Sequence, residues 1–296
     1  MENGQISKNN MKVLLIGKNG QLGKEIVFDA QRRGIELFAY GREDLDITDS
    51  EKLKTEIEKV SPDVVVNVSA YHVVPDCELY PQEAFKVNST AVKELAVICK
   101  ELDIIFVTYS TDYVFDGLKG SPYETADVPN PLQVYGISKA AGEFAALNYN
   151  KKTYVIRTCG VYGGESGSRS KNGNFILNIL KQVGDKDEIE VASEQIVNPT
   201  YAVDLAKASF DLLEKNPEYG IYHLTSEGYC SWAQFAQAVL RLKNISTKIV
   251  PIDKGGGESY PKRPLFSALS NSKAKALGID MPSWEDALKR YLETIQ

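Results

Sequence analysis

The chain has 296 residues, of which 43% are hydrophobic and 25% are charged, as is ordinary for a globular protein with one large domain or with a domain and a smaller lobe. Its 34 basic and 40 acidic residues give a net charge of −6, and no basic stripe is concentrated in it, which argues against nucleic acid or an acidic membrane surface as a partner. No apolar run approaches the roughly 20 residues that a membrane span requires.

The N-terminus and the cysteines indicate a cytoplasmic protein. Residues 1–10 are polar and precede a second methionine, Met11, so we expect a disordered leader or extension and not a signal peptide. The cysteines form no Cys-x-x-Cys motif, which is typical of buried thiols in a reducing compartment: Cys77, Cys99, Cys159 and Cys230. With only two histidines a histidine-rich metal site is excluded, whereas a carboxylate magnesium site stays open, with no residues to assign to it.

A glycine-rich turn follows the first predicted strand. Residues 12–16 are a short run of β-forming apolar residues, and Gly17, Gly20 and Gly23 come directly after it. Apolar residues then recur at helical spacing over residues 22–33. Glycines at a strand-to-helix turn let a diphosphate approach the backbone and the N-terminus of the helix. The G-x-x-G-x-x-G spacing therefore predicts a dinucleotide site, with a plain tight turn as the alternative.

The end of the second predicted strand, residues 36–40, bears on the choice of cofactor. Arg42 can pair with the 2′-phosphate of NADP(H), which favours NADPH and leaves NADH open. Glu43 or Asp44 can instead reach the cofactor ribose, and an exposed loop arginine is nearly as good an interpretation of Arg42. Thr48 is expected to cap the next helix.

Alternating strands and helices predict an α/β fold with a doubly wound parallel sheet. The third strand, residues 63–68, ends at Ser69 and Ala70, where small residues leave room for a cofactor. The fourth strand, residues 104–109, ends just before Thr111. Ligands bind beyond the carboxyl ends of such strands, and a hydroxyl there can donate a hydrogen bond to a substrate carbonyl.

Tyr135 and Lys139 are four residues apart and therefore share one face of a predicted helix that Pro131 is expected to begin. A free phenol has a pKa of about 10, and a neighbouring ammonium stabilises the phenolate. The pair suits proton donation to a carbonyl oxygen while a hydride reaches the carbon. A solvated helix face is the alternative for an isolated Tyr-x-x-x-Lys match.

The other elements follow in chain order. They are a core helix from Pro81 to Leu102, a strand over 153–159, a loop over 163–173 with Arg169 and Lys171, a helix over 175–183, a helix through Asp204 and Leu212, a strand over 221–225, a helix capped by Ser231, and a flexible loop at 255–257. The loop over 163–173 is expected to be mobile, and a lid over a charged substrate is the sharper alternative. Lys262-Arg263-Pro264 can bind a diphosphate or form a surface turn.

Together these motifs resemble the extended short-chain dehydrogenase/reductases and, more closely, the dTDP-4-dehydrorhamnose reductase family, over residues 11–295. The resemblance rests on Gly17 to Gly23 with Gln21-Leu22, on Ser110-Thr111-Asp112-Tyr113-Val114-Phe115-Asp116-Gly117, on Val134 to Lys139 with Gly142-Glu143, on Arg157-Thr158, on Pro199-Thr200 with Asp204-Leu205, and on Arg263-Pro264 with Ser267.

The resemblance implies a Rossmann domain over residues 11–160, to which residues 199–225 return, and a smaller C-terminal substrate-binding lobe of residues 161–198 and 226–296. It implies NAD(P)H-dependent reduction of the 4-keto group of a nucleotide-linked 6-deoxyhexose, with Thr111, Tyr135 and Lys139 as the catalytic set. Tyr135 is then the acid, and Lys139 binds the nicotinamide ribose. Enzymes of this family often form dimers, sometimes with magnesium at the contact, so a homodimer is an open possibility.

The resemblance also implies the binding residues. Those expected at the cofactor are Gly17, Asn19, Gly20, Gln21, Leu22, Gly23, Arg42, Asp46, Ile47, Ser69, Ala70, Tyr71, Tyr135 and Lys139. Those expected at the substrate are His72, Thr111, Asp112, Tyr113, Tyr135, Gly160, Asn174, Pro199, Thr200 and Arg263.

Three departures from the family pattern fall where the sugar is expected. Gly160 replaces a tryptophan, His72 and Pro75 replace a threonine and an aspartate, and the loop before Asn174 is longer than usual. They leave two alternatives open. One is a related reductase for a different nucleotide 4-ketosugar. The other is a non-catalytic NADP-binding subunit like the regulatory β-subunit of methionine adenosyltransferase, against which the complete Thr–Tyr–Lys set argues.

Overall fold

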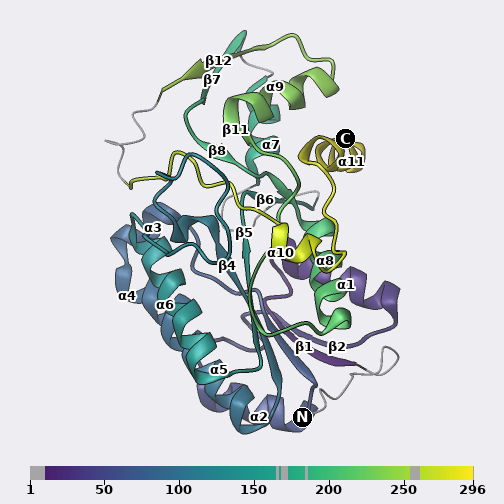
Figure 1. Cartoon of the computed structure of the whole chain (residues 1–296). Helices are drawn as coiled ribbons and strands as arrows, with labels where there is room; N and C mark the ends of the chain where they lie inside the picture. Colours follow the sequence, from purple (N-terminus) through teal and green to yellow (C-terminus); the bar gives the residue numbers. More distant parts are fainter. Residues whose placement is uncertain (1–10, 165–166, 168–172, 184–185, 254–260, 296) are drawn as a thin grey trace.

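A parallel sheet of six strands, flanked by helices on both faces, forms the larger part of the computed structural model (Figure 1). The structure describes residues 11–164, 167, 173–183, 186–253 and 261–295. The strands lie in the order β2 (Glu36–Tyr40), β1 (Lys12–Ile16), β3 (Val64–Asn67), β4 (Ile105–Thr111), β5 (Thr153–Thr158) and β10 (Gly220–His223). All five neighbouring pairs are parallel, which confirms the predicted doubly wound α/β fold.

The strands are largely apolar on both faces because helices cover both faces of the sheet. Val13 and Leu15 pack with α1 (Gln21–Arg33) and α8 (Ala202–Lys215). Leu14 and Ile16, which alternate with them, pack on the other face. The helices of that face are α2 (Ser50–Val60), α5 (Ala91–Glu101) and α6 (Val134–Tyr149).

The long helix predicted from Pro81 to Leu102 is interrupted. It consists of α4 (Pro81–Phe85), a π-helical segment (Lys86–Thr90) and α5, and a short helix that was not predicted, α3 (Val74–Leu79), precedes it. The π-helical segment lies where α6 comes very close, since a Cβ on Gly142 would collide with the backbone carbonyl of Asn88. Such segments alter the direction of side chains within a helix and are frequent at functional sites.

Two predicted helix starts are wrong by one to three residues. The cap of α2 is Asp49, whose carboxylate accepts a hydrogen bond from the backbone N–H of Lys52 at 3.0 Å. Thr48 instead donates to Asp46 at 2.9 Å. A side chain that finds its partner outside the helix cannot cap it.

The second of these helices is α6, which begins after its cap, Gln133, and not at Pro131. The side chain of Gln133 accepts a hydrogen bond from the N–H of Gly136 at 2.6 Å. In contrast, Ser231 caps α9 (Trp232–Leu242) as predicted and forms a capping box with Gln234.

The upper part of the molecule in Figure 1 consists of short strand pairs and three helices. The strand pairs are β7 (Glu188–Ala192) with β12 (Lys248–Ile252), β8 (Ile196–Val197) with β11 (Cys230–Ser231), and β6 (Val161–Tyr162) with β9 (Thr200–Tyr201). The helices are α7 (Phe175–Val183), α9 and α11 (Trp284–Thr294), and the short α10 (Ser272–Lys275) lies below them. The sequence analysis did not predict β7, β12 or α11. Whether this part is a separate lobe with the predicted boundaries stays a prediction.

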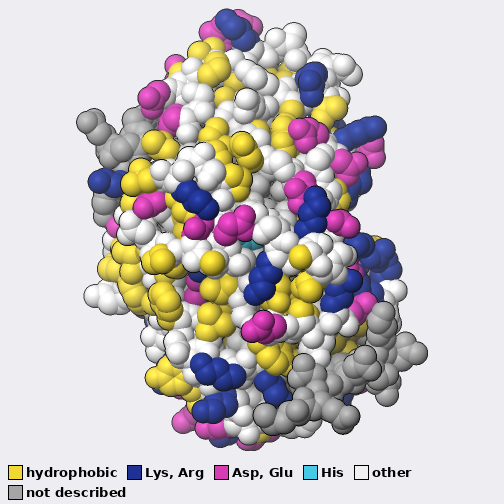
Figure 2. All heavy atoms as spheres, in the orientation of Figure 1, with side chains coloured by type: hydrophobic (Ala, Val, Ile, Leu, Met, Phe, Trp, Pro, Cys, Tyr) yellow, Lys and Arg dark blue, Asp and Glu magenta, His cyan; other side chains and the backbone are white. Residues whose placement is uncertain are grey.

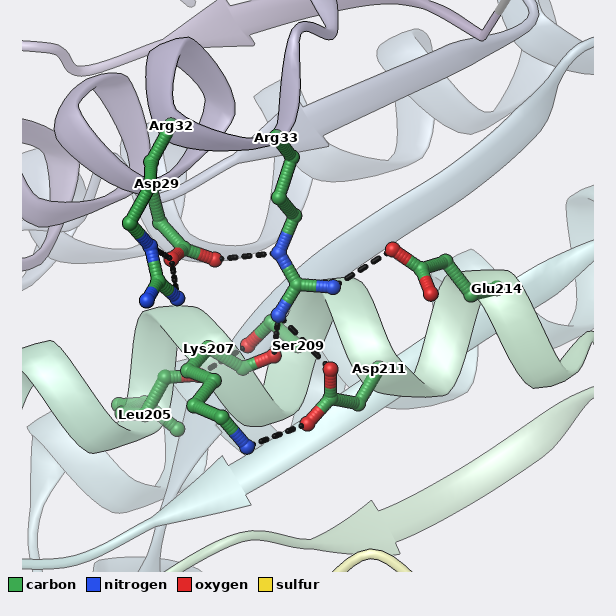
Figure 3. A network of polar contacts seen from close by, with 8 residues as sticks. All are labelled: Asp29, Arg32, Arg33, Leu205, Lys207, Ser209, Asp211 and Glu214. Atoms are coloured by element: carbon green, nitrogen blue, oxygen red, sulfur yellow. Dashed lines mark hydrogen bonds and ion pairs between the residues drawn. The ribbon is translucent and has the colours of Figure 1, made fainter. Parts of the chain in front are cut away.

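A charged network ties α1 to α8 (Figure 3). Arg33 on α1 donates to Asp211 at 2.7 Å and to Glu214 at 2.6 Å, both on α8. It also donates to Asp29 on its own helix at 2.7 Å. The guanidinium is only 16% exposed, so these contacts count for more than a surface ion pair would.

Three predictions concern residues outside those described: the leader over 1–10, most of the loop over 163–173 with Arg169 and Lys171, and the glycines at 255–257. Across the described ranges, no helix combines the length and the apolar character needed to cross a membrane.

Candidate active site

The glycine turn lies where the strand order reverses. From β1 the chain continues to β2 on one side and later to β3 on the other, so a ligand-binding crevice is expected beyond the carboxyl ends of β1 and β3. Gly17 ends β1 with a φ of +100°, and a Cβ there would lie 3.0 Å from the hydroxyl of Ser69 after β3. A Cβ on Gly23 would collide with the carbonyl of Gly17. Only glycine fits both positions.

The N-terminus of α1 is suited to an anion. Its N-cap, Gly20, has no side chain to accept hydrogen bonds from the first turn, and that turn carries no acidic residue. A Cβ added to Gly20 would have one neighbour within 4 Å outside its own helix and chain neighbours, the carbonyl oxygen of Gly17. Free N–H groups, a helix dipole and open space form the cradle that a diphosphate requires. These residues fit a dinucleotide.

Two cations lie at the end of the crevice near β2. The exposed side chain of Arg42 pairs with Asp46 at 3.1 Å. Lys18, which the sequence analysis did not single out, pairs with Asp44 at 2.7 Å, and this contact lowers the pKa of the Asp44 carboxyl. Both cations lie where an NADP 2′-phosphate would be expected, although acidic neighbours already hold them. Lys18 could have been noticed in the sequence as the one charged residue of the glycine turn.

Asn88, which was not predicted at the site either, is hydrogen-bonded to the segment after β3. Its amide oxygen accepts the N–H of Tyr71 at 2.8 Å, and its amide nitrogen donates to the Tyr71 carbonyl at 2.9 Å and to Ser138 at 3.0 Å. Ser138 donates in turn to the carbonyl of Tyr135 at 2.8 Å. Asn88 is 1% exposed and thus joins the predicted cofactor segment Ser69–Tyr71 to the helix of Tyr135. The only signal in the sequence was a polar residue beside an apolar stripe.

Thr111 and Tyr135 come together at the carboxyl edge of the sheet. The Thr111 hydroxyl lies close enough to the phenol of Tyr135 to affect its pKa, and the ring of Tyr113 contacts that of Tyr135 edge to face, with the ring centroids 6.0 Å apart. We expected a cationic neighbour to lower the pKa of Tyr135. Instead the pKa is raised, because burial of the phenol outweighs the opposing effect of Thr111 and the charge of Asp112 acts in the same direction as burial.

Lys139 lies one turn further along α6. Its ammonium donates to the carbonyl of Tyr109 at 2.6 Å. Burial lowers the pKa of Lys139 from 10.5 to about 8, and the negative charge of Glu143 opposes that shift. Glu143 is bound by Arg157 through two hydrogen bonds of 2.9 and 2.6 Å, and both side chains are buried. Tyr135, Lys139 and Glu143 thus follow one another at four-residue intervals along one face of α6.

Asp112 was predicted to contact substrate, but it is only 4% exposed. Its carboxylate accepts hydrogen bonds from Thr111 at 2.9 Å and from Ser267 at 2.5 Å. Burial raises the pKa of Asp112 in spite of these two donors. The structure therefore places Asp112 behind Thr111, on the side away from solvent.

Two other residues predicted at the substrate are also buried. Asn174 caps α7 by accepting the N–H of Leu177 at 3.0 Å, and it donates to the hydroxyl of Tyr291 at 2.8 Å. Thr200 is fully buried and donates to the carbonyl of Asn198 at 3.0 Å. Neither side chain is shown in contact with Thr111 or Tyr135. Pro199, next to Thr200, is buried as well.

The remaining predicted substrate residues differ in their exposure. Arg263 is exposed, and its charge lowers the pKa of Tyr113 against the larger opposing effect of burial, so the two residues are near each other. His72 is half-buried, with Nδ1 3.4 Å from the carbonyl of Ala70. Gly160 has a φ of +56°, and a Cβ there would lie 3.4 Å from the ring of Trp232. Another residue at position 160 would be strained by this backbone conformation, and its Cβ would lie 3.2 Å from the carbonyl oxygen of Asn198.

In the part of the chain that the structure describes, no group of three or more His, Cys, Asp and Glu side chains converges that could hold a metal ion.

Comparisons with known proteins agree with this geometry. The family model described as the RmlD substrate binding domain matches residues 11–296. The spore coat polysaccharide biosynthesis protein SpsK of Bacillus subtilis is 34% identical over 95% of this chain and 97% of its own length. A dTDP-4-dehydrorhamnose reductase of Sinorhizobium fredii is 33% identical, again over 95% of this chain and 97% of its own.

Solved structures agree as well. A dTDP-4-dehydrorhamnose reductase from Clostridium acetobutylicum superimposes with a TM-score of 0.89 at 33% identity, covering 96% of this chain and 99% of that one. The Bacillus anthracis reductase in complex with NADP gives a TM-score of 0.89 at 28% identity, covering 97% of this chain and 100% of that one. Since the family model and these relatives span nearly the whole chain, the chain belongs to the dTDP-4-dehydrorhamnose reductase family.

Proposed function

We propose that this chain is a reductase that uses NADPH, or NADH, to convert the 4-keto group of dTDP-4-dehydro-L-rhamnose into the hydroxyl of dTDP-L-rhamnose. The observation that carries the proposal is the convergence of Thr111, Tyr135 and Lys139 at the carboxyl edge of the sheet, in a chain of this family. Of the two hydroxyl groups, that of Tyr135 is the one whose proton is acidic enough to be transferred.

Tyr135 and Lys139 have separate roles in the proposed reaction. The bound cofactor supplies a hydride to C4 of the sugar. Tyr135 donates its phenol proton to the ketone oxygen, so the developing alkoxide is neutralised and the phenolate is reprotonated from solvent. Lys139 has three N–H donors and gives one to Tyr109, which leaves two for the cofactor ribose. Its positive charge also favours the transient phenolate.

The cofactor is held by the glycine turn and the cations near β2. Gly17, Gly20 and Gly23 admit the diphosphate to the N-terminus of α1. Lys18 and Arg42 support a preference for NADPH, because either can turn from its acidic partner to a 2′-phosphate. Comparison of kcat/KM for the two cofactors tests the preference, and an equal or higher value with NADH would contradict it.

Purified protein mixed with NADPH and dTDP-4-dehydrorhamnose should consume the absorbance of the reduced cofactor. Tyr135→Phe should lose at least about 100-fold in kcat while it still binds NADPH, since general acid catalysis contributes on that order. Tyr149→Phe is the matched control, because it removes the same atom from the exposed end of the same helix. Wild-type turnover by Tyr135→Phe would refute the assigned role. NADPH binding without turnover of any ketosugar would instead favour the non-catalytic subunit.

The identity of the sugar is a separate question. Gly160 and His72 stand where the family pattern described above implies a tryptophan and a threonine, and Gly160 lies against Trp232. Both support testing a panel of nucleotide 4-ketosugars in the same assay. The highest kcat/KM on the rhamnose precursor supports the proposal as stated, and a better substrate from the panel would replace it.

We also infer a cytoplasmic homodimer. The four cysteines are buried free thiols, as suits a reducing compartment. Figure 2 shows hydrophobic side chains gathered on the left flank, over α3, α4 and α6, and the exposed face of α6 includes Ile137 and Phe144. The only charged residues of α6, Lys139 and Glu143, are buried. Light scattering during size-exclusion chromatography measures the mass, and a monomer at micromolar concentration would contradict the dimer.

A further inference from the structure

Tyr135 lies in the first turn of α6, where the backbone N–H groups have no partner within the helix. Two of these groups flank Tyr135. The N–H of Gly136, which follows it, donates to the side chain of the helix cap, Gln133, at 2.6 Å. The N–H of Val134, which precedes it, donates to the carboxylate of Glu78 at 2.8 Å. Glu78 lies on α3, 56 residues earlier in the chain, so a side chain from another helix completes this cap.

A carboxylate suits the start of α6. The first turn of α6 contains no acidic residue of its own. A negative charge is stabilised at the N-terminus of a helix, and an ionised acceptor forms a stronger hydrogen bond than a neutral one. Pro75 in the first turn of α3 restricts the backbone φ there, which supports the short helix that carries Glu78. Glu78 therefore supplies an acceptor that α6 does not have in its own sequence.

α3 also contacts the predicted cofactor segment after β3. The thiol of Cys77, next to Glu78, donates to the carbonyl of Tyr71 at 3.4 Å. The same carbonyl accepts a hydrogen bond from Asn88 at 2.9 Å, and Asn88 donates to Ser138 on α6 at 3.0 Å. Two routes therefore join the cofactor segment to α6. One passes through Asn88 to the second turn of the helix, and the other passes through α3 and Glu78 to the first turn.

We propose that Glu78 is a positioning residue for Tyr135: by accepting the N–H of Val134, it fixes the first turn of α6, and with it the phenol, relative to the cofactor segment. The same turn lies tightly against the chain after β4, because a Cβ on Gly136 would collide with the carbonyl of Tyr113. Displacement of a reacting group by about 1 Å can lower a rate on the order of 100-fold. The role of Glu78 in the reaction rests on the proposed function of Tyr135 as the acid.

The first measurement needs no turnover. Hydrogen exchange of the Val134 amide, followed by NMR of the full chain labelled with nitrogen-15, reports on the bond to Glu78 directly. Glu78→Leu removes the acceptor, whereas Glu78→Gln retains an oxygen that can accept the same N–H. We expect exchange to accelerate at least about tenfold in Glu78→Leu and less than about threefold in Glu78→Gln. Exchange at the wild-type rate in Glu78→Leu would overturn the proposal, and so would equal acceleration in the two variants.

The second measurement is the assay with NADPH and dTDP-4-dehydrorhamnose. Glu78→Leu should lower kcat at least about fivefold and leave the KM for NADPH within about twofold, and Glu78→Gln should retain more than about half of the wild-type kcat. The control is Ser283→Ala, which removes the capping hydroxyl of α11 and should leave kcat unchanged. An unchanged kcat in Glu78→Leu would overturn the proposal. An equal loss in Ser283→Ala would also overturn it, because any lost helix cap would then have the same effect.

A third variant covers the case in which Glu78→Leu does not fold. Glu78→Asp keeps the charge, but its carboxylate is one methylene shorter and cannot reach the N–H of Val134 at the present distance of 2.8 Å. It should accelerate exchange and lower kcat in the same direction, and wild-type values of both would overturn the proposal. If Tyr135→Phe turns over like the wild type, the proposed function fails, whereas the exchange rates still decide whether Glu78 holds this turn.

Discussion

The ion pair of Glu143 and Arg157 offers the sharpest test of how the site is supported. Their side chains are 3% and 1% exposed and share two hydrogen bonds of 2.9 and 2.6 Å. Glu143→Gln keeps the shape and one acceptor but leaves the guanidinium of Arg157 buried without a counter-charge. Removal of one partner of such a pair costs about 3–5 kcal/mol. The ring of Phe115, 5.0 Å from the guanidinium, offsets part of that loss, so we expect about 3 kcal/mol.

Equilibrium unfolding in urea, followed by circular dichroism and by the fluorescence of Trp232 and Trp284, measures the free energy of unfolding. The matched control is the double variant Glu143→Leu with Arg157→Met, which removes both charges and should cost no more than about 1 kcal/mol. A single variant within about 1 kcal/mol of the wild type would refute the reasoning. So would a double variant that is less stable than Glu143→Gln.

The same substitution has a second readout at Lys139. Glu143 opposes the lowering of the Lys139 pKa, so its neutralisation should bring that pKa further below about 8. The alkaline limb of the pH profile of kcat should therefore move to lower pH in Glu143→Gln. An unmoved limb would show that Glu143 acts on stability alone.

Three further predictions concern charge and pH. Activity of the wild type should fall as the pH rises past about 8, because Lys139 then loses its proton. The residual activity of Lys139→Met should show no such decrease. A wild-type activity that stays constant up to about pH 10 would contradict this prediction. Burial lowers the pKa of His223 from 6.5 to about 3. Between these two pH values the unfolded chain therefore binds one more proton than the folded chain. The free energy of unfolding should fall on acidification below pH 6.5, by up to about 1.4 kcal/mol per pH unit. Thermal unfolding from pH 7 to 4 compares the wild type with His223→Gln. The variant should lose less stability over this range, by the amount that His223 contributes. Equal pH dependence of stability in the two proteins would contradict the prediction. Arg33→Met should lower the free energy of unfolding in urea by about 2–3 kcal/mol and leave kcat unchanged. The control is Arg32→Met, whose side chain is 58% exposed and which should lower it by less than about 1 kcal/mol. Equal losses would show that the contact of Arg33 with α8 does not account for the effect.

Local sequence patterns were enough to predict the first strand, the glycine turn and the helix after it. The apolar run over 12–16, the glycines after it and the helical spacing that follows predicted a strand, a turn and a helix that the structure contains, because each depends on neighbours in the chain. The same holds for the capping box at Ser231. Thr111 was predicted at the site because ligands bind beyond the carboxyl ends of parallel strands, which is a rule of topology and needs no coordinates. Tyr135 was joined to it by the resemblance to the family.

Long-range contacts decided the rest. Asp112 is a buried acceptor because Ser267, 155 residues later, donates to it. Asn88 binds Tyr71 and Ser138 only because a π-helical segment turns it toward them where α6 passes close by. Thr200 donates to the carbonyl of Asn198, and Asn174 donates to Tyr291, which lies 117 residues later in the chain. Their contact with substrate stays a prediction.

The sequence by itself was enough for the parallel sheet and for the strand, glycine turn and helix at its start, since hydrophobic period and glycine spacing are properties of short segments. It also singled out Tyr135 as the proton donor, which stays a prediction. Only the tertiary structure decided which carboxylates are buried, which partners they contact and in which direction each pKa is displaced. Those quantities depend on desolvation and on partners that the fold brings from far along the chain, and no local pattern records them.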